Sequence, residues 1–261
     1  MNRENPNKPN QPIIHLKNVA FSYNGENVLE NVNVEIFEKE FIWIVGPNGG
    51  GKTTLIKIIL GLLRPQQGIA TVYGEKPRKE RHRIGYMTQE TDLDLQYPVT
   101  VLDVALMGRI GNGGGGLFKR LTNHDKKIAE SALSEVGLEN LKDKPFSNLS
   151  GGQLRRLLIA RALAVEPDIL ILDEPNANLD VDSEKELYNL LKKLNERLTI
   201  ITVSHDSTFV SDFVKRVLCV NREVHEHPTS AVNGEFASHL FDGRRRIVQH
   251  NRDIGEDYLN D

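Results

Sequence analysis

The stretch that decides the fold runs from Phe41 to Leu60 and reads FIWIVGPNGGGKTTLIKIIL. Its apolar start predicts a buried strand, and its end, from Thr54 onward, predicts a helix. Between them, Gly46 to Thr53 fit the pattern G-x-x-x-x-G-K-[ST], a loop whose backbone N–H groups cradle phosphates. The positive end of the helix dipole favours an anion at the same position. A glycine-rich surface turn is the alternative, but strand, loop, lysine, hydroxyl and helix together favour a phosphate site.

Two side chains of this loop have expected roles. Lys52 can neutralise the β- and γ-phosphates of a nucleotide, and the Thr53 hydroxyl can hold Mg²⁺. The loop therefore predicts nucleotide binding, but it does not say what the nucleotide is used for.

The composition narrows the classes of function. The chain has 261 residues, enough for one large α/β domain or two small ones. Its net charge of −3 gives no electrostatic reason to expect nucleic acid as the main partner. The single cysteine, Cys219, cannot form an internal disulfide, which fits a reducing cytosol. No apolar run is long enough to span a bilayer, so a role at a membrane would need spanning helices from another chain.

The residue patterns predict an α/β core interrupted by a helical insertion. Strand patterns lie at 14–19, 28–37, 69–73 and 84–87, and fully buried strands at 169–172 and 199–203. Helix patterns lie at 101–107, 124–136, 154–165 and 183–197. We therefore expect a disordered tail over 1–12, a core domain over 13–225 with a helical subdomain inserted at about 89–165, and a C-terminal appendage over 226–261.

Two carboxylates follow a buried strand. Asp173 and Glu174 come directly after the apolar residues 169–172, so they lie at the carboxyl edge of the sheet, where ligands bind in open α/β folds. Asp173 can hold Mg²⁺ directly or through water, and Glu174 can polarise an attacking water. Acidic residues are also common at solvated strand ends, but the phosphate loop in the same chain favours the functional interpretation.

A second helix start has features of an anion site. Ser150 and Gln153 have the spacing of a capping box, and Gly151 and Gly152 would let a phosphate approach the backbone closely. An ordinary capped helix explains these residues equally well. The residues alone leave both interpretations open.

Two more residues have an ambiguous role. His205 follows the buried strand 199–203 and could contact a γ-phosphate, although a lone histidine at a strand end is more often structural or solvated. Tyr23 is either a packed aromatic residue or a platform for a base, and stacking of this kind contributes about 1–3 kcal/mol per base. A resemblance to known proteins favours the functional interpretation of both residues.

In order and spacing, these motifs resemble those of the ATP-binding cassette (ABC) ATPases over about residues 13–224. The run Leu149-Ser150-Gly151-Gly152-Gln153 matches the family signature in full, and residues 169–174 resemble Walker B with its catalytic glutamate. Gln89 resembles the Q-loop glutamine, Asp180 the D-loop aspartate and His205 the switch histidine. Tyr23 lies where the family stacks adenine.

The resemblance implies a fold and a set of site residues. The fold is an α/β P-loop NTPase core with a mixed or parallel sheet, an antiparallel β lobe and an inserted helical subdomain. The implied catalytic residues are Glu174, His205 and Gln89, and the implied Mg²⁺ ligands are Thr53, Gln89 and Asp173. ATP would contact Tyr23, Gly46, Pro47, Asn48, Gly49, Gly50, Gly51, Lys52, Thr53 and Thr54. In a head-to-tail homodimer, the second copy would complete the site with Ser150, Gly151, Gly152, Gln153 and Asp180.

A narrower resemblance concerns the cargo. Residues 82–86, 97–104 and 107–109, and the run from Cys219 to His227, are similar to the ATPase subunits of zinc, manganese and iron importers. This similarity implies a cytoplasmic ATPase, peripheral on the inner face of the cell membrane, without a nucleic-acid partner. Its implied partners are a second copy of itself, a membrane permease contacted through the helical subdomain, and a separate metal-binding protein outside the cell. We interpret His225 and His227 as solvated residues rather than as a metal site.

Three hypotheses follow from these motifs. The first is a transport ATPase that powers uptake of a divalent metal ion or, as an alternative, of another small cargo. The second is a soluble cassette ATPase acting on nucleic acid or ribosomes, but such proteins usually carry a long coiled coil or two cassettes in one chain, and this chain has neither. The third is a kinase or GTPase with a chance signature, which would phosphorylate an acceptor or prefer guanine.

Overall fold

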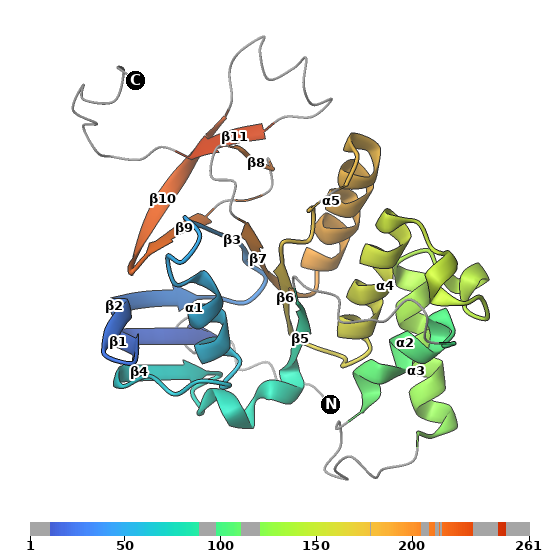
Figure 1. Ribbon diagram of the computed structural model, residues 1–261, viewed down its shortest axis with the longest axis horizontal. Helices are drawn as coiled ribbons and strands as arrows, with labels where there is room; N and C mark the ends of the chain where they lie inside the picture. The colour runs from blue at the N-terminus through green and yellow to red at the C-terminus, as the bar shows by residue number, and fades with distance from the viewer. Residues whose placement is uncertain are drawn as a thin grey trace.

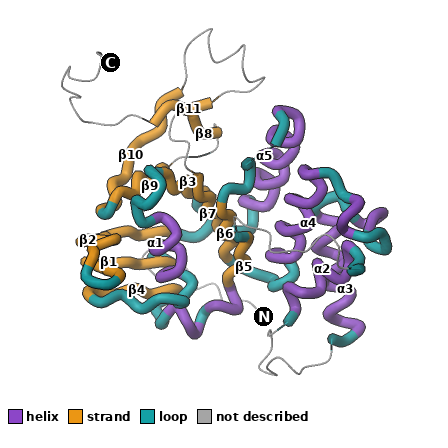
Figure 2. The backbone as a smooth tube through the Cα atoms, in the orientation of Figure 1, coloured by secondary structure: helices purple, strands orange, loops and turns teal. Residues whose placement is uncertain are grey.

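The computed structural model describes residues 11–88, 98–110, 121–177, 179–204, 209–211, 214, 216–231 and 245–248. Within these ranges the chain forms a mixed sheet and a smaller antiparallel sheet (Figure 1). The larger helices are α1 (Lys52–Ile59), α2 (Val101–Leu106), α3 (Asn123–Glu135), α4 (Gly151–Leu163) and α5 (Val181–Asn195). Helices α2 to α5 gather on one side of the mixed sheet, and α1 lies with the smaller sheet on the other (Figure 2).

The mixed sheet has the strand order β5-β6-β7-β3-β9-β10-β11-β8. Its parallel part consists of β5 (Ile84–Met87), β6 (Ile169–Asp173), β7 (Thr199–Ser204), β3 (Phe41–Val45) and β9 (Arg216–Asn221). The strands β10 (Glu223–Ala231), β11 (Arg245–Val248) and β8 (Phe209–Ser211) extend it in antiparallel pairing. Because parallel strands end at the same edge, the residues that follow β3 and β6 come together there.

The central strand β3 is an unbroken apolar run because both of its faces are covered. Trp43 and Val45 pack into the core on the side of α2 to α5, whereas Ile42 and Ile44 pack on the side of α1. Every residue of β3 is buried, and the same holds for β6 and β7. A parallel strand that is covered on both faces has no solvent side and therefore no polar alternation.

The smaller sheet is the antiparallel lobe that the family resemblance implies. Its strand order is β2-β1-β4, formed by β1 (Ile14–Tyr23), β2 (Glu26–Ile36) and β4 (Gln67–Val72). Asn24 and Gly25 connect β1 to β2 with φ of 50° and 85°, as tight hairpin turns require. The hairpin pairs Tyr23 with Glu26.

The insertion between β5 and β6 is helical where it is described. The helices α2, α3 and α4 each begin at a capping box, formed by Thr100 with Asp103, Thr122 with Asp125, and Ser150 with Gln153. In each box the two side chains satisfy first-turn N–H groups that the helix leaves unpaired. The apolar faces of these helices share one core with Trp43 of β3.

The C-terminal part differs from the expectation. The boundary expected between residues 225 and 226 falls inside β10, which pairs with β9 and continues to Ala231. The strand has a weak sequence signal because Glu223, His225 and Glu226 are exposed and give no apolar alternation. The expected tail lies outside the described residues up to position 10. None of the helices in the described ranges has the length and apolarity that a membrane crossing requires.

Candidate functional site

The loop after β3 needs glycine at both of its ends. Gly46, Gly49 and Gly51 have φ of 153°, 77° and 103°, values that other residues rarely adopt. A Cβ atom would lie 2.1 Å from the Val220 carbonyl oxygen at Gly46, and 2.8 Å from the Val28 carbonyl oxygen at Gly51. At Gly49 it would meet nothing within 4 Å. The loop is therefore packed tightly against β9 and β2 and open at its tip.

The start of α1 has no side-chain cap. Its N-cap residue, Gly51, is left-handed and supplies no hydrogen bond to the first turn. The first N–H groups of a helix have no acceptor within the helix, and the helix dipole makes this end positive. An uncapped helix start at the bottom of an open loop is the geometry that a phosphate needs.

Lys52 is held in place beside this helix start. Its ammonium donates to the carbonyl oxygens of Gly46 at 2.7 Å and Pro47 at 3.0 Å. Burial lowers the pKa of Lys52, and the charges of Glu174 and Asp173 raise it. Because its partners are neutral carbonyl groups, the ammonium keeps its charge available for an anion in the loop.

Asp173 is buried at the carboxyl end of β6, with 6% of its surface exposed. Burial raises the pKa of Asp173, and the hydroxyl of Tyr86, which donates to Asp173 Oδ2 at 3.3 Å, lowers it. Tyr86 comes from β5, the neighbouring parallel strand. A desolvated carboxylate at this edge is suited to hold a cation.

Glu174 leaves the sheet in a sharp turn. Its φ is 49°, which is uncommon for a residue other than glycine. Its N–H donates to the Val203 carbonyl oxygen at 2.9 Å, so β7 holds the turn. A backbone conformation of this kind costs about 1–3 kcal/mol and is found most often at functional sites.

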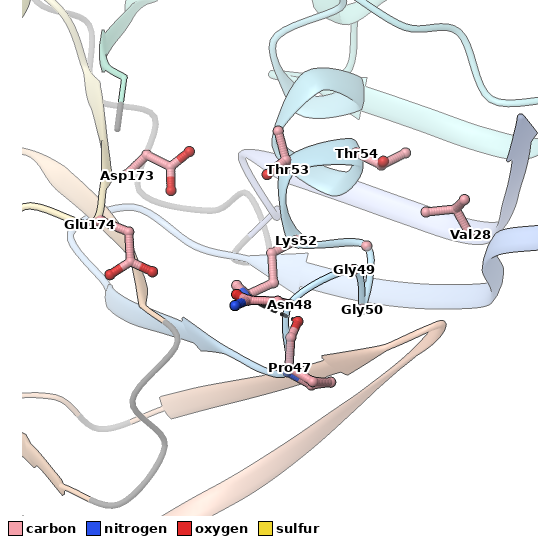
Figure 3. Close-up of a pocket in the computed structure, with 11 residues that line it drawn as sticks. Val28, Pro47, Asn48, Gly49, Gly50, Lys52, Thr53, Thr54, Asp173 and Glu174 are labelled. Carbon is pink, nitrogen blue, oxygen red and sulfur yellow. Dashed lines mark hydrogen bonds between the residues drawn. The ribbon is translucent and has the colours of Figure 1, made fainter. Parts of the chain in front are cut away.

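The loop and the two carboxylates face each other across one cavity (Figure 3). Its volume is about 240 Å³, and its walls are Val28, the residues from Pro47 to Thr54, Asp173 and Glu174. Asp173 and Glu174 reach into it from the end of β6, and Lys52 and Thr53 from the start of α1. Hydroxyl and carboxylate oxygens suit Mg²⁺, and the amides with Lys52 suit phosphates. The cavity is smaller than the roughly 300–1,000 Å³ of a site that encloses a drug-sized ligand.

The signature residues are not part of this cavity. Ser150 Oγ accepts from the N–H of Gln153 at 3.3 Å, and Gln153 Oε1 accepts from the N–H of Ser150 at 3.0 Å. The capping box expected from the sequence is therefore confirmed. A Cβ atom at Gly151 would meet nothing within 4 Å. This end of α4 is open to solvent, and the walls of the cavity include none of its residues.

Asp180 lies beside the signature rather than in the cavity. It caps α5, where Asp180 Oδ1 accepts from the N–H of Ser183 and Oδ2 from its hydroxyl, both at 2.9 Å. These hydrogen bonds lower the pKa of Asp180. A Cβ atom at Gly152 would lie 3.0 Å from Ser183 Oγ. The structure therefore brings Asp180 and the signature together, as two parts of one exposed surface.

Tyr23 is 44% exposed at the end of β1, in an edge-to-face contact with Phe21 at 4.9 Å between ring centroids. It is absent from the cavity walls, although Val28 from the same hairpin is present. Gln89 and His205 lie outside the described residues.

The structure adds contributors that the motifs did not indicate. Tyr86 contacts Asp173, and its place at the end of a strand parallel to β6 is a signal that could have indicated it. The Val220 carbonyl oxygen limits Gly46 to glycine, and Val28 lines the cavity. Nothing in the local sequence marks either of these residues, because both act through the packing of distant strands.

Comparisons with known proteins agree with this geometry. The family described as ABC transporter matches residues 29–177. The zinc uptake system ATP-binding protein ZurA of Listeria innocua is 36% identical, over 91% of this chain and 88% of that protein. The manganese transport system ATP-binding protein MntB of Bacillus subtilis is 38% identical, over 84% of this chain and 88% of that protein. A bacterial ABC transporter cassette solved as a dimer is 33% identical, with a TM-score of 0.68 over 85% of this chain and 99% of that one.

Proposed function

This chain belongs to the ABC transporter family, and from that premise we propose that it is the ATP-hydrolysing subunit of an importer for zinc, manganese or iron. One observation supports the cargo. Two relatives that match more than four fifths of the chain are a zinc uptake and a manganese transport ATP-binding protein. Any ATPase of the family needs the nucleotide motifs. These matches, however, also run through the helical subdomain.

The proposed site residues have separate roles in binding ATP. The amides at the start of α1 and the Lys52 ammonium bind the phosphates, and Tyr23 stacks on the adenine. Thr53, Gln89 and Asp173 would hold Mg²⁺, which when bound neutralises charge that develops on the phosphate oxygens. The oxygen donors of Thr53 and Asp173, which line one cavity opposite Lys52, fit this ion.

Glu174 is the proposed general base. It orients the attacking water and accepts its proton while the water oxygen bonds to the γ-phosphorus and the bond to the ADP oxygen breaks. Its burial and its fixed backbone turn hold the carboxylate in place before the substrate binds. His205 would contact the γ-phosphate from the end of the neighbouring strand β7, and Gln89 would link the site to the helical subdomain.

A second copy of the chain would complete the site. The cavity is small, the signature residues lie outside it, and Ser150 and Gly151 are exposed, all of which supports a head-to-tail homodimer. In that arrangement Ser150, Gly151, Gly152, Gln153 and Asp180 of one copy face the ATP bound by the phosphate loop of the other. Binding of two ATP molecules would then close the dimer.

An import ATPase of this family acts with a membrane permease. We place the chain on the cytoplasmic face of the membrane, with the helical subdomain against the permease and a separate metal-binding protein outside the cell. Closure of the dimer would move the permease between its two states, and hydrolysis would reset it.

The cargo is tested by growth of a strain that lacks this chain. In metal-poor medium, the wild-type chain is expected to restore growth and Glu174→Gln is not. Separate supplements of zinc, manganese and iron then identify the ion. Growth that responds to none of the three would contradict the proposed cargo and leave the ATPase activity in place.

The composite site is tested by mixing two inactive variants. Lys52→Ala damages the phosphate loop, and Ser150→Arg blocks the signature. Each homodimer has two damaged sites, but a mixed dimer has one site built from two intact halves. Turnover that appears only in differently tagged, co-purified mixed dimers supports the composite site. Mixed dimers that stay inactive while each variant still folds would contradict it.

A further inference from the structure

Arg155 connects the signature helix α4 to the turn that carries Glu174. Its Nη2 atom donates to the Ala177 carbonyl oxygen at 3.3 Å. The N–H of Ala177 in turn donates to the Glu174 carbonyl oxygen at 3.2 Å, which closes the turn. A side chain of α4 therefore holds one end of a turn whose other end is the proposed base.

The Arg155 side chain is partly buried, and one of its donor atoms is unused. Its Nη1 atom is inaccessible and makes no hydrogen bond within the described part of the chain. Burial lowers the pKa of Arg155, and the negative charge of Glu174 raises it. A buried donor without an acceptor is costly, so the position of Arg155 beside the turn that carries Glu174 calls for a functional explanation.

Two further contacts join α4 to α5, which follows the turn, and we call this interface the seam. Gly152 packs directly against Ser183, since a Cβ atom there would lie 3.0 Å from Ser183 Oγ. One turn along the helix, Arg156 Nη1 pairs with Glu186 Oε2 at 2.7 Å. A rotation of α4 is therefore passed to the segment that begins at Glu174, because packed elements move together rather than deform.

We propose that Arg155 is a positioning residue that transmits the state of the signature helix to Glu174 of the same chain. The inference rests on the proposed function, in which the signature binds the ATP of the opposite site. When that ATP draws α4 into the closed dimer, Arg155 moves with the helix and sets the turn from Glu174 to Ala177. Each chain then activates its own base only after its signature has engaged the partner's nucleotide, so one side chain couples the two sites.

The first test is Arg155→Gln in the full-length chain. We expect kcat to fall by at least about tenfold, because a misplacement of about 1 Å in a catalytic group costs up to about 10²-fold. The half-saturating ATP concentration should stay unchanged, since the phosphate loop is untouched, and this also shows that the variant is folded. Arg155→Lys keeps the positive charge and a hydrogen-bond donor group, and should recover part of the lost kcat.

The second test is a double-mutant cycle with Glu174→Gln, measured in single turnovers. A residue that acts through Glu174 causes no further loss once that carboxylate is gone. Arg156→Gln is the matched control, because it removes the neighbouring arginine and a contact of the same seam. Its ion pair is partly exposed, so kcat should change by no more than about fivefold.

Several outcomes would overturn the inference. Wild-type kcat in Arg155→Gln would do so, as would an equal loss with and without the Glu174 carboxylate. A fall in kcat for Arg156→Gln as large as that for Arg155→Gln would assign the effect to loosening of the seam. In all three cases the wild-type chain still hydrolyses ATP, so the proposed function stands. A wild-type chain that releases no phosphate would overturn both.

Discussion

Two helices of this chain begin where an anion could bind, and they are built in opposite ways. α1 starts without a cap, after the glycine loop and beside the buried Lys52, at the base of a cavity. α4 starts at a capping box in which Ser150 and Gln153 satisfy each other's N–H groups, and its surface is open. Both starts carry the positive end of a helix dipole, but only the first keeps its amides without a side-chain acceptor.

This difference indicates a division of labour. An uncapped start that is enclosed by the protein is ready to bind phosphate alone. A capped and exposed start contributes only when another surface brings an anion to it. In the proposed homodimer, the two starts would be the two halves of one site, each half supplied by a different copy of the chain.

The largest effect is expected from Glu174→Gln. If the chemistry occurs at the α1 half, loss of the base should lower kcat by about 10²–10⁴-fold. ATP binding should remain because the loop and Lys52 are unchanged, and the closed dimer should accumulate. Phosphate release, ATP affinity and dimer mass measure the three quantities. Glu196→Gln, an exposed residue at the end of α5, is the control. Wild-type turnover in Glu174→Gln would remove this residue from the role of base.

The next effect concerns the tight packing of the α1 half. Gly51→Ala forces a side chain into a left-handed conformation, and its Cβ atom meets both Leu29 Cδ2 and the Val28 carbonyl oxygen at 2.8 Å. We expect the free energy of unfolding to fall by about 2 kcal/mol or more. Gly49 also has a positive φ, of 77°, but a Cβ atom there meets nothing within 4 Å. Gly49→Ala should therefore lower the free energy of unfolding by less than Gly51→Ala. Equal losses in urea denaturation would show that packing against β2 contributes nothing.

Much of the α1 half could be predicted from the sequence, because its signals are local. An apolar run, a glycine loop with lysine and a helix pattern follow one another between Phe41 and Leu60, and each decides its own structure. The position of Asp173 at the carboxyl end of the sheet was predictable in the same way, from the apolar residues before it. The structure confirms the strand at Phe41–Val45 and the helix expected from Thr54, which begins two residues earlier, at Lys52.

The remaining features depend on contacts between distant segments. The close approach of Val220 to Gly46 and the hydrogen bond from Tyr86 to Asp173 require strands that are far apart in sequence to be neighbours. β10 was missed because its described residues Glu223, His225 and Glu226 are exposed and leave Val224 without an apolar alternation around it. The capping box at Ser150 was predictable, but its sequence pattern is the same whether or not the helix also meets a phosphate.

A smaller effect separates the two possible roles of Ser150, as a helix cap and as a contact to phosphate. Ser150→Ala removes the cap and should lower the free energy of unfolding by about 1 kcal/mol. Thr122→Ala removes the equivalent cap of α3, away from the cavity, and should cost a similar amount. Only Ser150→Ala should also lower steady-state ATP turnover. If both variants leave turnover unchanged, or lower it equally, the signature serine acts only through helix stability.

The smallest effect on stability is expected from Gly151→Ala, and it has the opposite sign to that of Gly51→Ala. Gly151 is the first residue of α4 in a helical conformation, and a Cβ atom there meets nothing within 4 Å. Alanine should therefore stabilise the isolated chain by up to about 1 kcal/mol. In the proposed closed dimer, however, this surface would approach the phosphates of the partner's ATP, so the same methyl group should slow turnover. A variant that is more stable in denaturation and slower in phosphate release would show that the glycine is kept for a contact that one chain does not contain. A variant that is more stable and equally fast would place the second copy's contact elsewhere on α4.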